Sequence, residues 1–176
     1  MKNTIFFGRE LLFSAFLLFI IAGQALGQST SGSSLGMGLI FEAGSFLGDA
    51  GKNYKRGVGG SLAATYAIDN DVQLTFSAGY LHVQGKSFED VYLAYKIDDW
   101  KALPIRLGTK YFATPHLFLK AETGAVFFLE PGTGTALILS PGIGLQLHHF
   151  ELAAKLETWT DGGTVSFAGF SLGYFF

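Results

Sequence analysis

The sequence contains no cysteine, so the chain can form neither a disulfide nor a thiolate metal site. Charged residues make up only 15% of it, whereas an ordinary soluble domain carries about 25%. The formal net charge of −2 shows no basic excess of the kind that favours nucleic-acid binding. Beyond residue 27 there is no unbroken run of about 18 apolar residues, which a transmembrane helix requires. The chain is therefore apolar overall but has no apolar helix to account for it.

What the chain has instead is glycine, aromatic residues and alternation. It contains 24 glycines and 15% aromatic residues, and its mean hydropathy is +0.34. Apolar and small or polar residues alternate with a period of two over most of the chain, which is the pattern of β-strands with two different faces. An apolar, alternating chain without long apolar runs fits a closed transmembrane β-barrel, in which every backbone group is paired.

The first residues have the pattern of a secretory signal peptide. Lys2 and Arg9 precede an apolar run over 11–22, and the small residues of Ala25-Leu26-Gly27 follow it. The run is too short to span a membrane as a helix. We therefore predict a signal peptide over 1–27 that is cleaved after Gly27, a flexible lead-in over 28–34, and a single barrel domain over 35–176. A membrane-anchoring or buried helix is the alternative for the first segment.

The last stretch, 163–176, has one apolar face made of alternate residues, which include Phe170, Leu172, Tyr174 and Phe176. In water, such an uncovered strand is an aggregation hazard unless a membrane or another strand covers it. The stretch resembles the C-terminal sorting strand of bacterial outer-membrane barrels. The resemblance implies export to the outer membrane, contact with outer-membrane lipid, and recognition by the barrel-assembly machinery through this strand.

The alternation predicts eight strands, each close to the length of about 9–11 residues that a tilted strand needs to cross the hydrocarbon. They cover approximately 35–46, 58–68, 72–83, 102–112, 117–128, 135–147, 150–159 and 163–176. Tight turns are expected at Asp69-Asn70, Thr114-Pro115 and His148-His149. A polar loop is expected over 48–56. The longest irregular stretch is 84–101, part of which could extend the flanking strands beyond the membrane.

Alternation alone does not decide which face points outward, because a soluble lipocalin-like barrel has the same period with its faces reversed. Here the more polar face consists mainly of Gly, Ala, Ser and Thr, which suits a cramped interior. Aromatic residues on the apolar face also fall near the predicted strand ends, where a membrane girdle belongs, namely Tyr66, Tyr80, Tyr111, Phe127, Phe150 and Tyr174. These features favour an all-β, antiparallel, up-and-down transmembrane barrel.

Several charged residues lie on the face that is predicted to point inward, namely Glu42, Arg106, Lys110, Lys120, Glu122, Lys155 and Glu157. Charges enclosed in a narrow barrel must be paired or hydrated. Projection from the turns places Arg106 nearly opposite Glu122, Glu122 beside Gly142, and Gly142 beside Lys155. We therefore predict a charged belt in a plugged interior, with a proton path, gate or polar ligand site as the alternative.

Other motifs carry less information. The glycine-rich segments GVGGS (57–61) and PGTG (131–134) do not stand between a strand and a helix, so they are interpreted as turns. His148-His149 has no partner ligands placed with it, and no serine is placed beside His82, which lies on the apolar face. We expect no catalytic residue, no cofactor and no metal, and we interpret the protein as a non-enzyme.

The predicted signal peptide, the segment LPIRLGTKYF (103–112) and the ending FSLGYFF together resemble the small outer membrane protein β-barrel domain family, similar to outer membrane proteins A and X. The resemblance implies that the N-terminus and the tight turns lie in the periplasm. It implies a scaffold rather than an activity. We therefore expect an outer-membrane barrel with a structural or interaction role. Passage or binding of a small solute, and more remotely modification of lipid, are the alternatives.

Overall fold

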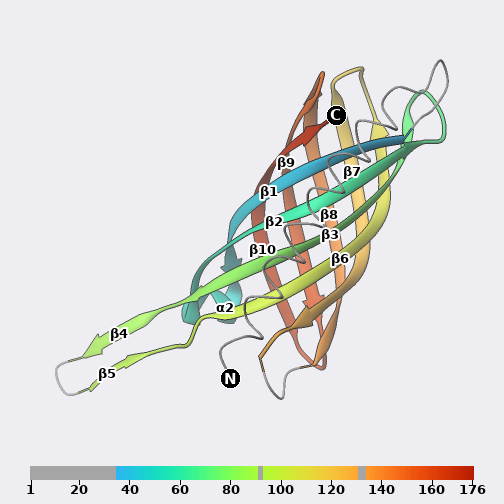
Figure 1. Ribbon diagram of the computed structural model, residues 1–176. Coiled ribbons are helices and arrows are strands. Elements are labelled where there is room, and N and C mark those ends of the chain that lie inside the picture. The colour runs from blue at the N-terminus through green and yellow to red at the C-terminus, as the bar shows by residue number, and fades with distance from the viewer. Residues whose placement is uncertain (1–34, 91–92, 131–133) are drawn as a thin grey trace, which may run out of the picture.

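The computed structural model describes residues 35–90, 93–130 and 134–176. The predicted signal peptide over 1–27, the lead-in over 28–34 and residues 131–133 of the PGTG segment lie outside this description. Eight of the described strands form one closed antiparallel barrel in the order β1-β10-β9-β8-β7-β6-β3-β2 (Figure 1). The predicted fold class is therefore confirmed.

The barrel strands are long, and each pairs with two neighbours. Their bounds are β1 Leu35–Leu47, β2 Tyr54–Ala67, β3 Val72–Gly85, β6 Trp100–Phe112, β7 Leu117–Phe128, β8 Thr135–Leu147, β9 Phe150–Thr160 and β10 Thr164–Phe175. Two short strands, β4 Ser87–Asp90 and β5 Leu93–Lys96, form a separate two-stranded sheet. Closure of the barrel by β1 and β10 leaves none of its eight strands with a free edge.

The two faces of the barrel differ as the alternation predicts. Large apolar side chains cover the outside, where Phe41 is 74% exposed, Leu137 69% and Phe170 68%. All six aromatic residues of the predicted girdle are also exposed. The inward positions carry the charged residues, together with small residues and a set of large aromatic rings. Because water solvates polar groups and hydrocarbon does not, this inside-out distribution suits a barrel surrounded by lipid.

Three tight connections lie at one end of the barrel, which we call the turn end. In the first, Ile68 N–H donates to Val72 O at 2.9 Å, and in the second, Ala113 N–H donates to Leu117 O at 2.9 Å. In the third, His148 has a φ of 52°, a left-handed conformation that is uncommon for a residue with a side chain. The predicted turns at Asp69-Asn70, Thr114-Pro115 and His148-His149 all fall in these connections.

The opposite end, which we call the ribbon end, departs from the predicted bounds. The expected loop over 48–56 contains a short helix, α2 Gly48–Asn53, and β2 begins at Tyr54 rather than at 58. An irregularity between Tyr54 and Arg56 lets β2 stay paired with β3 to the end of both strands. Sequence alternation is broken at such a bulge, which is why the strand start was misplaced. None of the helices in the part of the chain that the structure describes is long and apolar enough to cross a membrane.

The stretch 84–101 is more regular than expected. β3 continues to Gly85, β6 begins at Trp100, and β4 and β5 form a ribbon between them. Figure 1 shows this ribbon projecting well beyond the barrel, from the end that also carries α2, while the C-terminus lies at the opposite end. Part of the stretch therefore extends the flanking strands, as the sequence allowed.

The predicted sorting strand corresponds to β10. Phe170, Leu172 and Tyr174 are exposed on the outer face, and Phe176 follows the strand, its N–H donating to Met37 O at 2.9 Å. The inward face of β10 is less uniform than the sequence analysis expected. Gly169, Ser171 and Gly173 alternate with the outward residues, but the large rings of Phe167 and Phe175 are also buried there.

Candidate functional site: the charged interior

Eight charged side chains are buried in the barrel, and in the described residues they balance one another. They comprise four carboxylates and four cations, namely Glu42, Glu122, Glu151, Glu157, Arg106, Lys110, Lys120 and Lys155. They come from β1, β6, β7 and β9. The seven residues predicted for the interior are all among them. Balanced charge is a physical requirement in such a space, since an uncompensated buried charge costs several kcal/mol.

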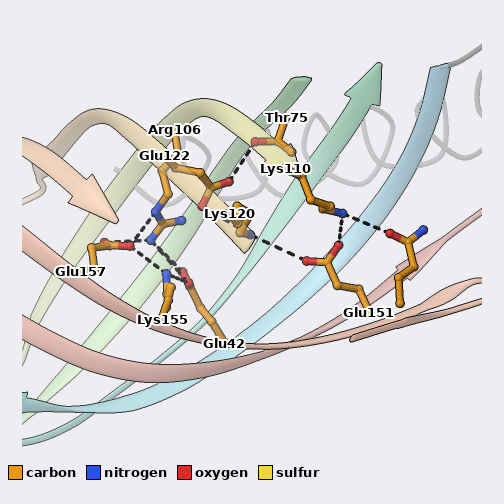
Figure 2. A network of polar contacts seen from close by, with 10 residues as sticks. Glu42, Thr75, Arg106, Lys110, Lys120, Glu122, Glu151, Lys155 and Glu157 are labelled. Atoms are coloured by element: carbon orange, nitrogen blue, oxygen red, sulfur yellow. Dashed lines mark hydrogen bonds and ion pairs between the residues drawn. The ribbon is translucent and has the colours of Figure 1, made fainter. Parts of the chain in front are cut away.

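The first group of four, which we call the arginine cluster, is centred on Arg106. Its Nε donates to Glu157 Oε2 at 2.8 Å and its Nη2 to Glu157 Oε1 at 3.0 Å, a bidentate contact that is among the stronger hydrogen-bond geometries. The same Nη2 lies 3.3 Å from Glu42 Oε1. Lys155 Nζ bridges the two carboxylates, 2.5 Å from Glu42 Oε2 and 2.8 Å from Glu157 Oε2 (Figure 2).

The second group, which we call the lysine cluster, contains Lys110, Lys120, Glu122 and Glu151. Lys110 is ion-paired with Glu151, and Lys120 Nζ lies 3.4 Å from Glu122 Oε2 and 3.7 Å from Glu151 Oε1. Neutral groups complete it, because Thr75 Oγ1 donates to Glu122 at 3.3 Å and Lys110 donates to Gln146 at 3.3 Å (Figure 2). Lys110 Nζ also lies 4.7 Å from the centre of the Phe118 ring, within cation–π range.

Small residues on neighbouring strands make room for these long side chains. Arg106 is flanked in register by Ser77 and Gly124, and Lys155 by Gly142 and Gly169. A Cβ added at Gly124 would lie 1.9 Å from Ile105 O, so this position accepts no side chain without a backbone shift. The glycine and serine of the inward face are thus the packing partners of the charges.

The predicted Arg106, Glu122, Lys155 belt is only partly correct. Gly142 is opposite Lys155 as expected, but Arg106 is opposite Gly124, and Glu122 lies between Gly108 and Ser140. The carboxylate partners of Arg106 are Glu157 and Glu42, on β9 and β1, which are not its neighbouring strands. In a narrow barrel the side chains meet across the lumen, which projection from the adjacent turns does not capture.

Glu151 belongs to the interior but was not included in the predicted network. Like Lys155 and Glu157, it is an odd-numbered residue of β9, so the alternation of the sequence already indicated that it faces inward. The aromatic residues that face inward are the larger omission. Trp159 is buried, and its Nε1 donates to Glu157 Oε1 at 2.6 Å, so an aromatic side chain completes the arginine cluster.

His82 lies outside the barrel at the ribbon end. Its Nε2 is 3.4 Å from Asp99 Oδ2, and its side chain lines an apolar groove of about 860 Å³ together with Phe41, Val58 and Tyr80. Ser171 also lines this groove but is a buried residue of the inward face, opposite Glu42. His82 therefore has an acidic partner in Asp99, but Ser171 does not lie on the lipid-facing surface.

Two histidines at the turn end, His116 and His149, make contacts with backbone carbonyl groups. Nδ1 of His149 lies 2.7 Å from Phe175 O, and Nδ1 of His116 lies 3.2 Å from Gln146 O. Within residues 35–90, 93–130 and 134–176, no group of three or more His, Asp or Glu side chains is placed to hold a metal ion.

Neither a protein-family model nor a curated protein sequence matches the chain. Solved structures do match. The attachment invasion locus protein Ail of Yersinia pestis is 23% identical over 82% of this chain and 100% of its own, with a TM-score of 0.55. The N-terminal β-barrel domain of Pseudomonas aeruginosa OprF is 16% identical over 82% and 100%, with a TM-score of 0.52.

The outer membrane enzyme PagL is 12% identical over 78% of this chain and 98% of its own, with a TM-score of 0.52. At identities of 23% or less, these matches establish the fold alone. One of the three matching proteins is described as an enzyme, and the other two are not. The three matches agree with the outer-membrane location that the sequence and the apolar outer face indicate. The chain therefore has the fold of a small eight-stranded outer-membrane β-barrel.

Removal of the Arg106 guanidinium tests the arginine cluster. We expect Arg106→Ala to lower the free energy of unfolding by about 3 kcal/mol or more, because Lys155 would then be the only cation paired with Glu42 and Glu157. The measurement is urea unfolding in lipid vesicles. Arg56→Ala is the matched control, since Arg56 is exposed at the ribbon end, and it should change stability by at most about 0.5 kcal/mol.

A double-mutant cycle in the same assay identifies the partner. Arg106→Ala combined with Glu157→Gln should show a coupling energy of about 1–3 kcal/mol. The coupling with Glu122→Gln should be much smaller, because Glu122 is paired with Lys120 and shares no hydrogen bond or ion pair with Arg106 in the described structure. Equal losses for Arg106→Ala and Arg56→Ala, or a larger coupling with Glu122, would contradict this assignment.

Proposed function

We propose that the protein is an integral outer-membrane barrel with a closed interior, and that its role is structural or consists of an interaction made outside the membrane. The observation that carries the proposal is the filling of the lumen by the arginine and lysine clusters. An eight-stranded barrel is just wide enough for side chains to fill it. The proposal assigns the chain no catalytic activity.

A layer of aromatic rings supports closure on the side of the arginine cluster that faces the ribbon end. It contains Phe46, Trp100, Phe128, Trp159 and Phe167. The ring centroids of Phe46 and Phe167 are 5.2 Å apart, and those of Trp100 and Trp159 are 5.6 Å apart. Rings at these separations are in packing contact. A hydrated ion would have to displace this layer as well as the ion pairs in order to cross.

The distribution of cavities also supports a closed interior. A cleft of about 690 Å³ opens at the turn end, where Asn70, His116 and Gln146 line it, and one of about 370 Å³ opens at the ribbon end. The cavity beside the lysine cluster measures only about 10 Å³, which is the space of a single water molecule. Solute binding in the two end clefts is the second candidate function, because these clefts are far larger than the cavity beside the lysine cluster.

The ribbon formed by β4 and β5 supports an interaction role. It projects from the barrel, and each of its strands pairs only with the other in the described sheets. The rings of Phe88 and Tyr95 stack across it with centroids 5.1 Å apart and planes at 17°, and Tyr95 is 56% exposed. Open strand edges and an exposed aromatic ring such as that of Tyr95 are features by which an extended segment of another protein is bound. The resemblance noted above implies that this end faces outward from the cell.

Planar-bilayer recording tests closure. We expect the unaltered protein to give no steady unit conductance, because the ion pairs and the aromatic layer occlude the lumen. The exposed variant Arg56→Ala serves as the control for reconstitution and should behave identically. A steady unit conductance that changes when Arg106 or Glu122 is substituted would contradict closure and support solute passage.

Native mass spectrometry of the protein extracted gently from its own outer membrane tests the interaction role. We expect a partner protein to leave with the barrel in fixed stoichiometry, and to be lost when Phe88 and Tyr95 are both replaced by Ala. Tyr66→Ala is the matched control, because Tyr66 is exposed on the barrel wall. A barrel that emerges bare, or a partner that survives loss of both rings, would contradict a role for the ribbon.

A further inference from the structure

The cleft at the ribbon end, which we call the mouth cleft, carries carboxylates that the closed-barrel function does not explain. It measures about 370 Å³, within the usual size range of small-ligand pockets. Three aromatic side chains line it, namely Tyr54, Trp100 and Phe128, and so do three carboxylates, namely Asp98, Asp99 and Glu130.

The aromatic side chains form a rigid base. All three are only partly buried, since they pack against the core cluster and also line the cleft. The Tyr54 and Trp100 centroids are 5.8 Å apart with the ring planes at 83°, and those of Trp100 and Phe128 are 5.3 Å apart at 69°. The rings therefore contact one another edge to face, and together they line the apolar part of the cleft.

Backbone groups hold two of the carboxylates in place. Asp99 Oδ1 accepts the N–H of Gly85 at 3.1 Å, and Glu130 Oε1 accepts the N–H of Lys101 at 2.8 Å. The Gly85 hydrogen bond lowers the pKa of Asp99 and so favours its ionised form. Lys96 Nζ lies 3.6 Å from Asp99 and offsets part of its charge, and His82 Nε2 lies 3.4 Å from the same carboxylate. Asp98 is exposed at the cleft.

We propose that the mouth cleft binds an alkylammonium group, held over the rings of Tyr54, Trp100 and Phe128 and attracted by the Asp98, Asp99 and Glu130 carboxylates. Aromatic faces attract cations through the ring quadrupole, and the attraction is strongest for tryptophan. A purely apolar ligand would gain nothing from the carboxylates, and an anion would be repelled by them. The same chemistry is available from a free small cation or from a lysine side chain of a peptide.

The two tryptophans of the chain provide the readout. Trp100 lines the cleft, whereas Trp159 is buried and hydrogen-bonded to Glu157, so the indole N–H signal of Trp159 is an internal control. Choline would be titrated into the full-length barrel in a nonionic detergent and followed by NMR. A spectrum of Trp159→Phe assigns the two signals. We expect choline to shift the Trp100 signal only, and its apparent Kd to rise with added NaCl.

Three comparisons decide the outcome. The neutral isostere 3,3-dimethylbutanol should shift the Trp100 signal much less than choline does. Asp98→Asn should weaken choline binding by about threefold to tenfold, the range expected for one charge interaction near a protein surface. Asp161→Asn, which removes an exposed carboxylate from another connection at the same end, should leave the Kd unchanged. Equal responses to choline and its isostere, or equal effects of the two substitutions, would overturn the proposal.

A further titration distinguishes the sources of the cation. Nα-acetyl-lysine amide presents the ammonium group of a peptide, and choline presents that of a free metabolite-sized ligand. Tighter binding of the lysine derivative assigns the site to a peptide side chain, and tighter binding of choline assigns it to a free small cation. Absence of a Trp100 shift with both ligands would overturn the proposal.

Discussion

Long charged side chains that share a narrow lumen must neutralise one another, and this constraint governs the rest of the structure. Arg106 reaches Glu157 and Glu42 on strands that are not its neighbours, and Lys155 joins the same two carboxylates. Because the side-chain period of a strand is two, a slip of one residue in any of these strands would move a charge to the lipid-facing side. The arginine cluster therefore depends on the correct register of strands that are far apart in sequence, and it favours that register over others.

The same constraint shapes the remainder of the inward face. Glycine and serine flank the charges because a larger side chain would occupy the space that Arg106 and Lys155 need. Aromatic rings fill the part of the lumen nearest the ribbon end, with Trp159 linking them to the arginine cluster through Glu157. An interior so filled has little room for a solute. The interaction role that we propose therefore relies on the ends of the barrel, above all on the β4–β5 ribbon and the mouth cleft at the ribbon end.

The fold followed from the sequence because alternation is a local property that each strand carries by itself. The two-residue turn at His148-His149 likewise gave the correct pairing of Gly142 with Lys155. The pairing of Arg106 was misjudged because its partners lie across the lumen, and distances across a lumen depend on barrel closure and strand tilt. The bulge after Tyr54 and the helix α2 interrupt the alternation without a distinctive residue pattern, so the bounds at the ribbon end were misplaced. The inward rings of Phe46 and Phe167 were missed because aromatic residues were expected on the outer face.

The most direct test of the central claim is hydrogen exchange at the Arg106 Nε–H, followed by NMR of the protein in lipid nanodiscs. This proton donates to Glu157 at 2.8 Å in a buried cluster, whereas the corresponding proton of Arg56 is donated to Gln84 at 3.2 Å in an exposed position. If the arginine cluster closes the barrel, the Arg106 signal should exchange with solvent far more slowly than that of Arg56. Equal and rapid exchange at the two sites would show that water reaches the cluster, and would contradict the closed, charge-paired interior.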